Sequence, residues 1–169
     1  MTYREWLATV PEEFTSDPLW RTEVYRQALF LGELAWHDAC KLAKNRVTLE
    51  VSDQLYRSAG KISANIAEGY SRSSGKDQAR FYEYGLGSAR EARDWYYKGR
   101  YVLGDIVFTH RIGLLTEIAK QLSKIVPKYR GLTISEERPE YIVSSPFDSL
   151  NDAPFTPDES LPAESNDSL

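Results

Sequence analysis

Residues 51–70 read VSDQLYRSAGKISANIAEGY, and the apolar residues of this stretch follow the period of an α-helix. They recur at steps of four, four, three and four residues: Val51, Leu55, Ala59, Ile62 and Ile66. Residues at this spacing fall along one face of a helix, and polar residues occupy most of the other positions. The stretch therefore predicts an amphipathic helix that buries one face against other parts of the chain.

Three further segments show the same periodicity, and helix start and stop signals separate them. Asp17-Pro18 is expected to begin the first, with Asp as the N-cap and Pro at the first helical position. Asn45-Arg46 predicts a short connection to residues 51–70, and Gly69 with the polar run after it ends that helix. Gly104-Asp105 predicts the turn before the fourth helix, which Pro127 is expected to stop near Tyr129.

These four helices predict an all-α protein: an up-down-up-down antiparallel four-helix bundle over residues 17–130. Residues 1–16 are expected to be an N-terminal extension with a short helix around Trp6-Leu7, since neighbouring apolar residues share a face. Residues 135–169 are rich in Pro, Ser, Asp and Glu, and we interpret them as a disordered acidic tail.

Composition indicates the broad class of protein. The chain has 169 residues, of which 41% are hydrophobic and 27% charged, as in ordinary globular domains. No apolar stretch reaches the roughly 20 residues of a membrane span, and no export signal is recognisable at the N-terminus. A single cysteine, Cys40, excludes an internal disulfide. A cytoplasmic protein without membrane association is therefore expected.

Charge is strongly segregated along the chain, although the net charge is only −4. Residues 1–18 carry −3 and residues 135–169 carry −8, which leaves +7 on residues 19–134. A basic body next to an acidic tail suggests binding to nucleic acid or an interaction made by the tail. The alternative is that the tail only improves the solubility of a mildly basic bundle.

Basic and aromatic residues are interleaved within residues 90–101: Arg90 and Arg93 precede Trp95, Tyr96 and Tyr97, and Lys98 and Arg100 lie between Tyr97 and Tyr101. Cations bind phosphates and aromatic rings stack on unpaired bases, although these rings could instead pack in the core or between subunits. Before the third helix, residues 71–76 could cap the helix or hold a phosphate. The candidate nucleic-acid-binding residues are Arg57, Lys61, Arg72, Lys76, Arg80, Arg90, Arg93, Lys98 and Arg100.

Small residues indicate close packing between the second and third helices. They are Ser58, Ala59, Ser63, Ala64 and Ala67 on one helix and Gly85, Gly87, Ser88 and Ala89 on the other. Glycine inside a helix costs about 1 kcal/mol relative to alanine, so a packing reason is expected. Four polar residues beside these faces are predicted to bond one another across the helix pair: Asn65, Glu68, Ser88 and Glu91.

Catalytic and cofactor chemistry is not expected. No nucleophile or companion base accompanies Glu68 and Glu91, so an acid/base pair is disfavoured. A di-iron bundle needs Glu-x-x-His pairs, but the residues three before His37 and His110 are Leu34 and Val107. No metal site, cofactor or enzymatic activity is therefore predicted.

Two motifs, SANIAEG at residues 63–69 and GLGSARE at residues 85–91, follow the lead-in QLYRSA at residues 54–59. With them, about residues 18–130 resemble a bacterial four-helix-bundle family first noticed as proteins encoded in intervening sequences of large-subunit ribosomal RNA genes. The resemblance implies a homopentamer with a basic surface. It also implies a relation to accessory variability proteins of diversity-generating retroelements, which bind nucleic acid and a reverse transcriptase.

The leading functional hypothesis is a non-enzymatic, oligomeric helical bundle that binds RNA or DNA through a basic surface. The alternative is a structural adaptor that recruits a protein partner and does not bind nucleic acid. For the acidic tail, three interpretations stay open. It could compete with nucleic acid for the basic helices, dock on a partner through Phe147, Leu150 and Phe155, or remain solvated without a partner.

Overall fold

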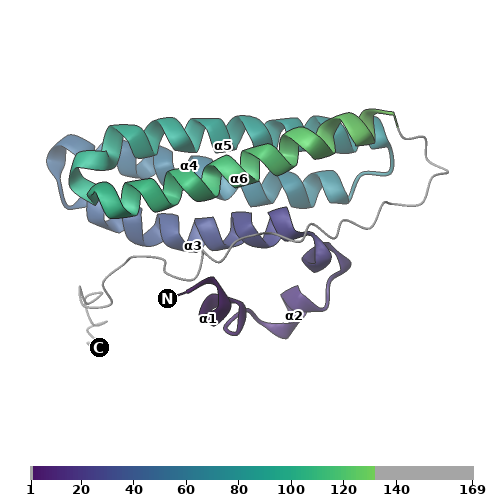
Figure 1. Ribbon diagram of the computed structural model, residues 1–169, viewed down its shortest axis with the longest axis horizontal. Coiled ribbons are helices and arrows are strands. Elements are labelled where there is room, and N and C mark those ends of the chain that lie inside the picture. The colour runs from purple at the N-terminus through teal and green to yellow at the C-terminus, as the bar shows by residue number, and fades with distance from the viewer. Residues whose placement is uncertain (1, 132–169) are drawn as a thin grey trace, which may run out of the picture.

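The structure, a computed structural model, describes residues 2–131, and within this range the regular structure is entirely helical (Figure 1). Four long helices lie side by side as a bundle, which confirms the all-α class. Helix α4 packs against α3 and α5, α5 packs against α6, and α3 also contacts α6. Their bounds are α3 Glu23–Ala43, α4 Leu49–Tyr70, α5 Gly75–Leu103 and α6 Asp105–Arg130.

The connections fall where the sequence predicts them. Asn45 accepts a hydrogen bond from the Val47 backbone at 2.9 Å and so caps the short 3-10 helix η2 (Arg46–Thr48). Ser74 accepts from the Asp77 backbone at 3.1 Å and starts α5. Gly104 separates α5 from α6 with φ of 88°, a backbone conformation that glycine adopts without strain.

The first long helix begins later than Asp17-Pro18, and that prediction is wrong. Asp17 does act as a cap, because its side chain accepts from the Leu19 backbone at 2.7 Å, but the helix it starts is η1 (Pro18–Arg21), a 3-10 turn. Thr22 is extended, with ψ of 107°, and this interrupts the helix before α3 starts at Glu23. At the other end, α6 contains Pro127 in its last turn and ends at Arg130, one residue beyond Tyr129.

The N-terminal residues fold against the bundle. The predicted helix around Trp6-Leu7 is present as α1 (Tyr3–Leu7), and a single turn, α2 (Glu12–Thr15), follows it. Thr2 and Glu5 form a capping box, in which each side chain accepts from the other's backbone N–H. The buried Trp6 ring packs 5.3 Å from that of Phe30, measured between centroids, so α1 covers part of α3.

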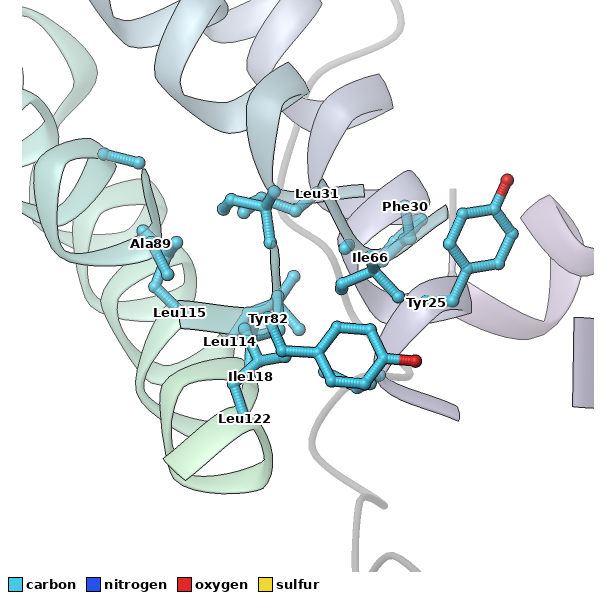
Figure 2. Packing of buried hydrophobic residues seen from close by; sticks show 14 of the residues in the cluster. Tyr25, Phe30, Leu31, Ile66, Tyr82, Ala89, Leu114, Leu115, Ile118 and Leu122 are labelled. Atoms are coloured by element: carbon cyan, nitrogen blue, oxygen red, sulfur yellow. The ribbon is translucent and has the colours of Figure 1, made fainter. Parts of the chain in front are cut away.

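All four long helices contribute to one hydrophobic core (Figure 2). Leu31 of α3, Ile66 of α4, Tyr82 of α5 and Leu115 of α6 are among its buried members. Burying each large aliphatic side chain contributes about 1.5–3 kcal/mol, so this shared core fixes which faces of α5 and α6 remain outside. No helix in the described range is both long enough and apolar enough to cross a lipid bilayer.

The small-residue faces of α4 and α5 are only partly used for packing. Ser58 and Ala59 are buried, and a Cβ at Gly85 would lie 3.5 Å from the Ile62 carbonyl oxygen, so the two helices approach closely there. Ala64 and Gly87, however, are exposed, and nothing lies within 4 Å of a Cβ built at Gly87. Their assignment to the packed face is wrong. The predicted acidic tail, residues 135–169, lies outside the described residues.

Candidate nucleic-acid interface

The nine predicted basic residues lie on α4, on α5 and in the turn between them. Eight are exposed and Arg100 is half-buried. Three form ion pairs with a carboxylate four residues earlier on the chain: Arg57 with Asp53 at 2.9 Å, Lys98 with Asp94 at 2.6 Å, and Arg72 with Glu68. These pairs neutralise part of the positive charge of the surface, although exposed pairs of this kind contribute little stability.

The other six basic residues form no ion pair with a carboxylate of the described residues: Lys61, Lys76, Arg80, Arg90, Arg93 and Arg100. Arg80 instead donates to the Tyr84 hydroxyl at 2.7 Å, and this hydrogen bond raises the pKa of Arg80. No carboxylate of the described residues therefore neutralises these six cations, and they are available to an external anion.

Several cations of this surface lie on aromatic rings. Lys98 Nζ lies 3.9 Å from the centroid of the Trp95 ring, and the Arg100 guanidinium lies 3.8 Å from that of Tyr97 and 4.2 Å from that of Tyr101. Arg72 lies in the same way 4.5 Å from the centroid of the Phe81 ring. Such cation–π contacts hold a long side chain in place while its charge remains exposed.

The aromatic residues of α5 divide between core and surface. Tyr96 is fully buried and Trp95 is half-buried, whereas Tyr97 is 55% exposed and Tyr101 is 83% exposed. Tyr96 therefore packs in the core, as one of the two interpretations of the sequence expects, while other rings remain accessible. Only Tyr97 and Tyr101 present most of a ring to solvent.

The structure brings Arg90 and Arg93 together at an open hollow between α5 and α6, which we call the α5–α6 hollow. Its volume is about 310 Å³, and its lining consists of Arg90, Arg93, Asp94 and Tyr97 of α5 with Phe108 and Ile112 of α6. The Tyr97 and Phe108 rings lie 6.3 Å apart between centroids. No residue of α4 lines the hollow, so Arg57 and Lys61 do not belong to it.

This arrangement combines two kinds of recognition. The guanidinium groups of Arg90 and Arg93 can hold phosphates or carboxylates, and the rings of Tyr97 and Phe108 with Ile112 offer an apolar surface to a planar group. Asp94 adds one negative charge at the rim, but its carboxylate is paired with Lys98. The hollow therefore suits a ligand that is both anionic and aromatic.

The predicted polar network between α4 and α5 does not form. Asn65 donates to the Lys61 carbonyl at 2.7 Å, Ser88 donates to the Tyr84 carbonyl at 2.9 Å, and Glu68 and Glu91 are both exposed. Glu68 pairs with Arg72, and Glu91 accepts from the Trp95 indole at 3.5 Å. Each of the four residues has a partner four positions away on its own helix or in the turn after it, so none of them bonds across the helix pair.

A different polar group, not predicted from the sequence, is buried between α3, α5 and α6. Arg111 is 0% exposed, and it donates to Asp38 through Nε at 2.7 Å and through Nη2 at 3.3 Å. Tyr96 donates its hydroxyl to the same carboxylate at 2.9 Å, and its pKa is raised well above the usual value by burial and by the charge of Asp38. The sequence does contain a signal for this group: Asp38 and Arg111 carry opposite charges, and each lies among the apolar residues of its helix.

His110 completes this buried group. Its Nδ1 lies 2.9 Å from Arg111 Nη1, while its Nε2 is buried without a hydrogen-bond partner. Burial, reinforced by the positive charge of Arg111, lowers the pKa of His110 to about 4. The histidine is therefore neutral at pH 7, and its Nδ1 accepts the hydrogen bond from the guanidinium.

Metal ligands do not cluster in the described part of the chain: residues 2–131 contain no group of three His, Cys, Asp or Glu side chains that could hold an ion. Cys40 is a free, half-buried thiol. Within this range, the hollow and the buried polar group are the arrangements of chemical interest.

The fold and the surface together define a helical-bundle protein with a basic, aromatic outer face on α5. The model of the 23S rRNA-intervening sequence protein family matches residues 21–125, and the chain belongs to this family. The match covers the four long helices almost completely and confirms the family resemblance of the SANIAEG and GLGSARE motifs. No curated protein and no solved structure is significantly similar to the chain.

Proposed function

We propose that this protein binds RNA or DNA without catalysing a reaction, and that the α5–α6 hollow with the neighbouring cations of α5 is the contact surface. One observation carries the proposal: two adjacent arginines, Arg90 and Arg93, form no ion pair with described residues and stand beside Tyr97 and Phe108. Arg57, by contrast, is paired with Asp53.

The chemistry of the surface predicts how it binds. Phosphate contacts by arginine and lysine are independent of sequence and weaken steeply as salt concentration rises. Stacking of an unpaired base on an aromatic side chain contributes about 1–3 kcal/mol and tolerates all bases. Single strands and loops should therefore bind more tightly than regular duplexes, with little sequence preference.

The test is fluorescence anisotropy with short labelled single-stranded RNA, single-stranded DNA and duplex DNA at several salt concentrations. We expect salt-dependent binding that favours the single strands. Tyr97→Ala should weaken single-strand binding about tenfold, which corresponds to the loss of one stacking contact. Phe14→Ala is the matched control, because Phe14 of α2 is a 48% exposed aromatic residue that does not line the hollow. Absence of binding to all three probes at low salt would exclude this function.

We also propose that the four long helices alternate in direction, as an up-down-up-down bundle, and that the protein assembles into a homopentamer in the cytoplasm. Short connections support the topology. The number of subunits is what the family resemblance implies. Exposed Trp36 and Tyr56, whose rings lie 5.5 Å apart between centroids, are candidates for a subunit contact. Light scattering should give a mass about five times 19.3 kDa, and a monomer would exclude the ring.

A second candidate function is that of an adaptor, and one observation favours it. A Cβ at Gly99 would lie 3.0 Å from Leu42 Cδ2, so the end of α5 lies beside the end of α3. Near these helix ends Val47, Tyr101 and Ile106 are 86%, 83% and 75% exposed. An apolar bundle end of this kind suits a protein partner. In the anisotropy test, the adaptor alone predicts no binding to any nucleic acid.

A further inference from the structure

The α5–α6 hollow has a second potential occupant besides nucleic acid, and the same chain supplies it. A peptide that fits the hollow needs an aromatic side chain for the surface of Tyr97, Phe108 and Ile112. It also needs carboxylates close by in sequence for the unpaired Arg90 and Arg93. Three aromatic residues within residues 135–169 have carboxylates close by in sequence: Tyr141, Phe147 and Phe155. Of these, only Phe147 is directly next to a carboxylate in a stretch without a basic residue.

Residues 146–152 read PFDSLND and meet both requirements. Phe147 is followed directly by Asp148, and Leu150 and Asp152 complete a segment with two apolar and two acidic side chains. The segment lies within residues 135–169, which carry −8, while residues 19–134 carry +7. Charge complementarity therefore favours an encounter between this segment and the basic body of the protein.

The length of chain outside the described residues is sufficient for the segment to reach the hollow. At about 1.5 Å per residue, the stretch of α6 from Ile112 to Arg130 spans about 27 Å. The 15 residues from 132 to 146 extend to about 50 Å at roughly 3.3 Å each. A segment tethered in this way has an effective concentration in the range of millimolar, so even a weak contact is populated.

We propose that residues 146–152 dock in the α5–α6 hollow, with Phe147 against its apolar lining and the acidic side chains on Arg90 and Arg93. Docked in this way, the segment excludes nucleic acid from the hollow. This regulatory consequence rests on the proposed function, whereas the docking itself does not. High salt weakens the docking because it screens the attraction between the acidic side chains and the arginines.

Disulfide trapping in the full-length chain tests the docking without nucleic acid. In a Cys40→Ser background, Asp94→Cys places a thiol at the rim of the hollow and Ser149→Cys places one next to Phe147. Ser165→Cys is the control for a tail position outside the segment. On mild oxidation, Phe147→Ser should slow the cross-linking of Ser149→Cys several-fold and leave that of Ser165→Cys unchanged, because tether length is the same with and without this substitution. A Ser149→Cys rate that does not depend on Phe147 would overturn the docking.

Affinity for labelled single-stranded RNA gives the second readout. Phe147→Ser should bind the RNA several-fold more tightly than the unmodified chain at low salt, and the difference should vanish at high salt. Phe155→Ser is the matched control, since Phe155 is a second aromatic residue in the acidic tail. An equal gain with both variants would overturn the assignment to residues 146–152. Fast, Phe147-dependent cross-linking in a protein that binds no nucleic acid would uphold the docking and refute the proposed function.

Discussion

At the scale of single residues, burial of the charges of Asp38 and Arg111 has a large desolvation cost. A desolvated ion pair is tolerated only when its geometry is good and its remaining polar atoms are satisfied. Here the Asp38 carboxylate accepts from two nitrogens of Arg111 and from the Tyr96 hydroxyl. The pair therefore joins α3 and α6, and the Tyr96 hydroxyl adds α5 at the same point.

Removing one partner of this pair should be strongly destabilising, because the other charge remains buried and uncompensated. Arg111→Met is expected to lower the free energy of unfolding by about 3–5 kcal/mol. In the triple variant Asp38→Leu, Tyr96→Phe, Arg111→Met, much of this loss should be recovered, since no buried charge is left uncompensated. His110 Nδ1 loses its hydrogen bond from Arg111 in both variants, so this loss does not affect the comparison. Urea unfolding followed by circular dichroism measures both values. A triple variant less stable than Arg111→Met would contradict this explanation.

His110 predicts a pH dependence of stability. Its pKa is about 4 in the folded protein and about 6.5 when exposed, because burial and Arg111 disfavour the charged ring. The unfolded chain therefore binds a proton between these values and the folded chain does not, so protonation favours unfolding. The free energy of unfolding therefore has its full value, as far as His110 is concerned, above pH 6.5, and it decreases as the pH falls from 6.5 to 4.

The variant His110→Gln is the reference for this pH dependence. The carboxylates titrate in both proteins, so their contribution cancels in the difference between the two free energies of unfolding. The free energy of unfolding of the unmodified chain should decrease relative to that of His110→Gln as the pH falls through this window. Denaturation series at pH 7.5, 6, 5 and 4 measure the difference. A difference that does not change with pH would show that the imidazole is not buried as a neutral group.

At the scale of elements, the helix boundaries depend on local signals that are readable in the sequence. Asn45, Ser74 and Gly104 cap or turn the chain where their residue types predict. The start of α3 was not predictable in this way, because the interruption at Thr22 is a backbone conformation that a hydrophobic period does not encode. Likewise, the hydrophobic periodicity of one helix does not indicate which of its glycines packs against a neighbouring helix.

Two glycines test the packing between α4 and α5. At Gly69 a Cβ would lie 2.8 Å from Tyr82 Cε1 and 3.0 Å from Phe81 Cβ, so Gly69→Ala should destabilise the protein by about 1–3 kcal/mol. At the exposed Gly87 nothing is near, so Gly87→Ala should stabilise it by about 0.5–1 kcal/mol through helix propensity. Thermal unfolding of the two variants should show shifts of opposite sign, and shifts of equal sign would contradict the packing described.

At the scale of the whole molecule, the bundle positions a charged aromatic surface on one side of α5. Arg90 and Arg93 were predictable as exposed cations from the sequence, because they alternate with buried positions of the helix. Their position beside the apolar lining of the α5–α6 hollow was not predictable. The other side of the hollow comes from Phe108 and Ile112 of α6, and spacing within α5 contains no information about which face of α6 it meets.

The charge distribution is also a property of the whole molecule, and it connects the two proposals. In our proposals, the acidic tail and an external polyanion compete for the same arginines of the positive body. Mutations that weaken the tail contact should therefore strengthen nucleic-acid binding, while mutations in the hollow should weaken both interactions.

The most direct test of the central claim is the salt dependence of nucleic-acid binding for the double variant Arg90→Ala, Arg93→Ala. Its matched control is Arg4→Ala, Arg21→Ala, which removes the same charge from exposed residues of the N-terminal region. Affinity for labelled single-stranded RNA is measured for both variants and the unmodified chain. Each lost phosphate contact should reduce the slope of log affinity against log salt by about 1. We predict a slope about 2 smaller and a large loss of affinity for the hollow variant alone. Equal slopes and affinities for the two variants would contradict a nucleic-acid site in the α5–α6 hollow.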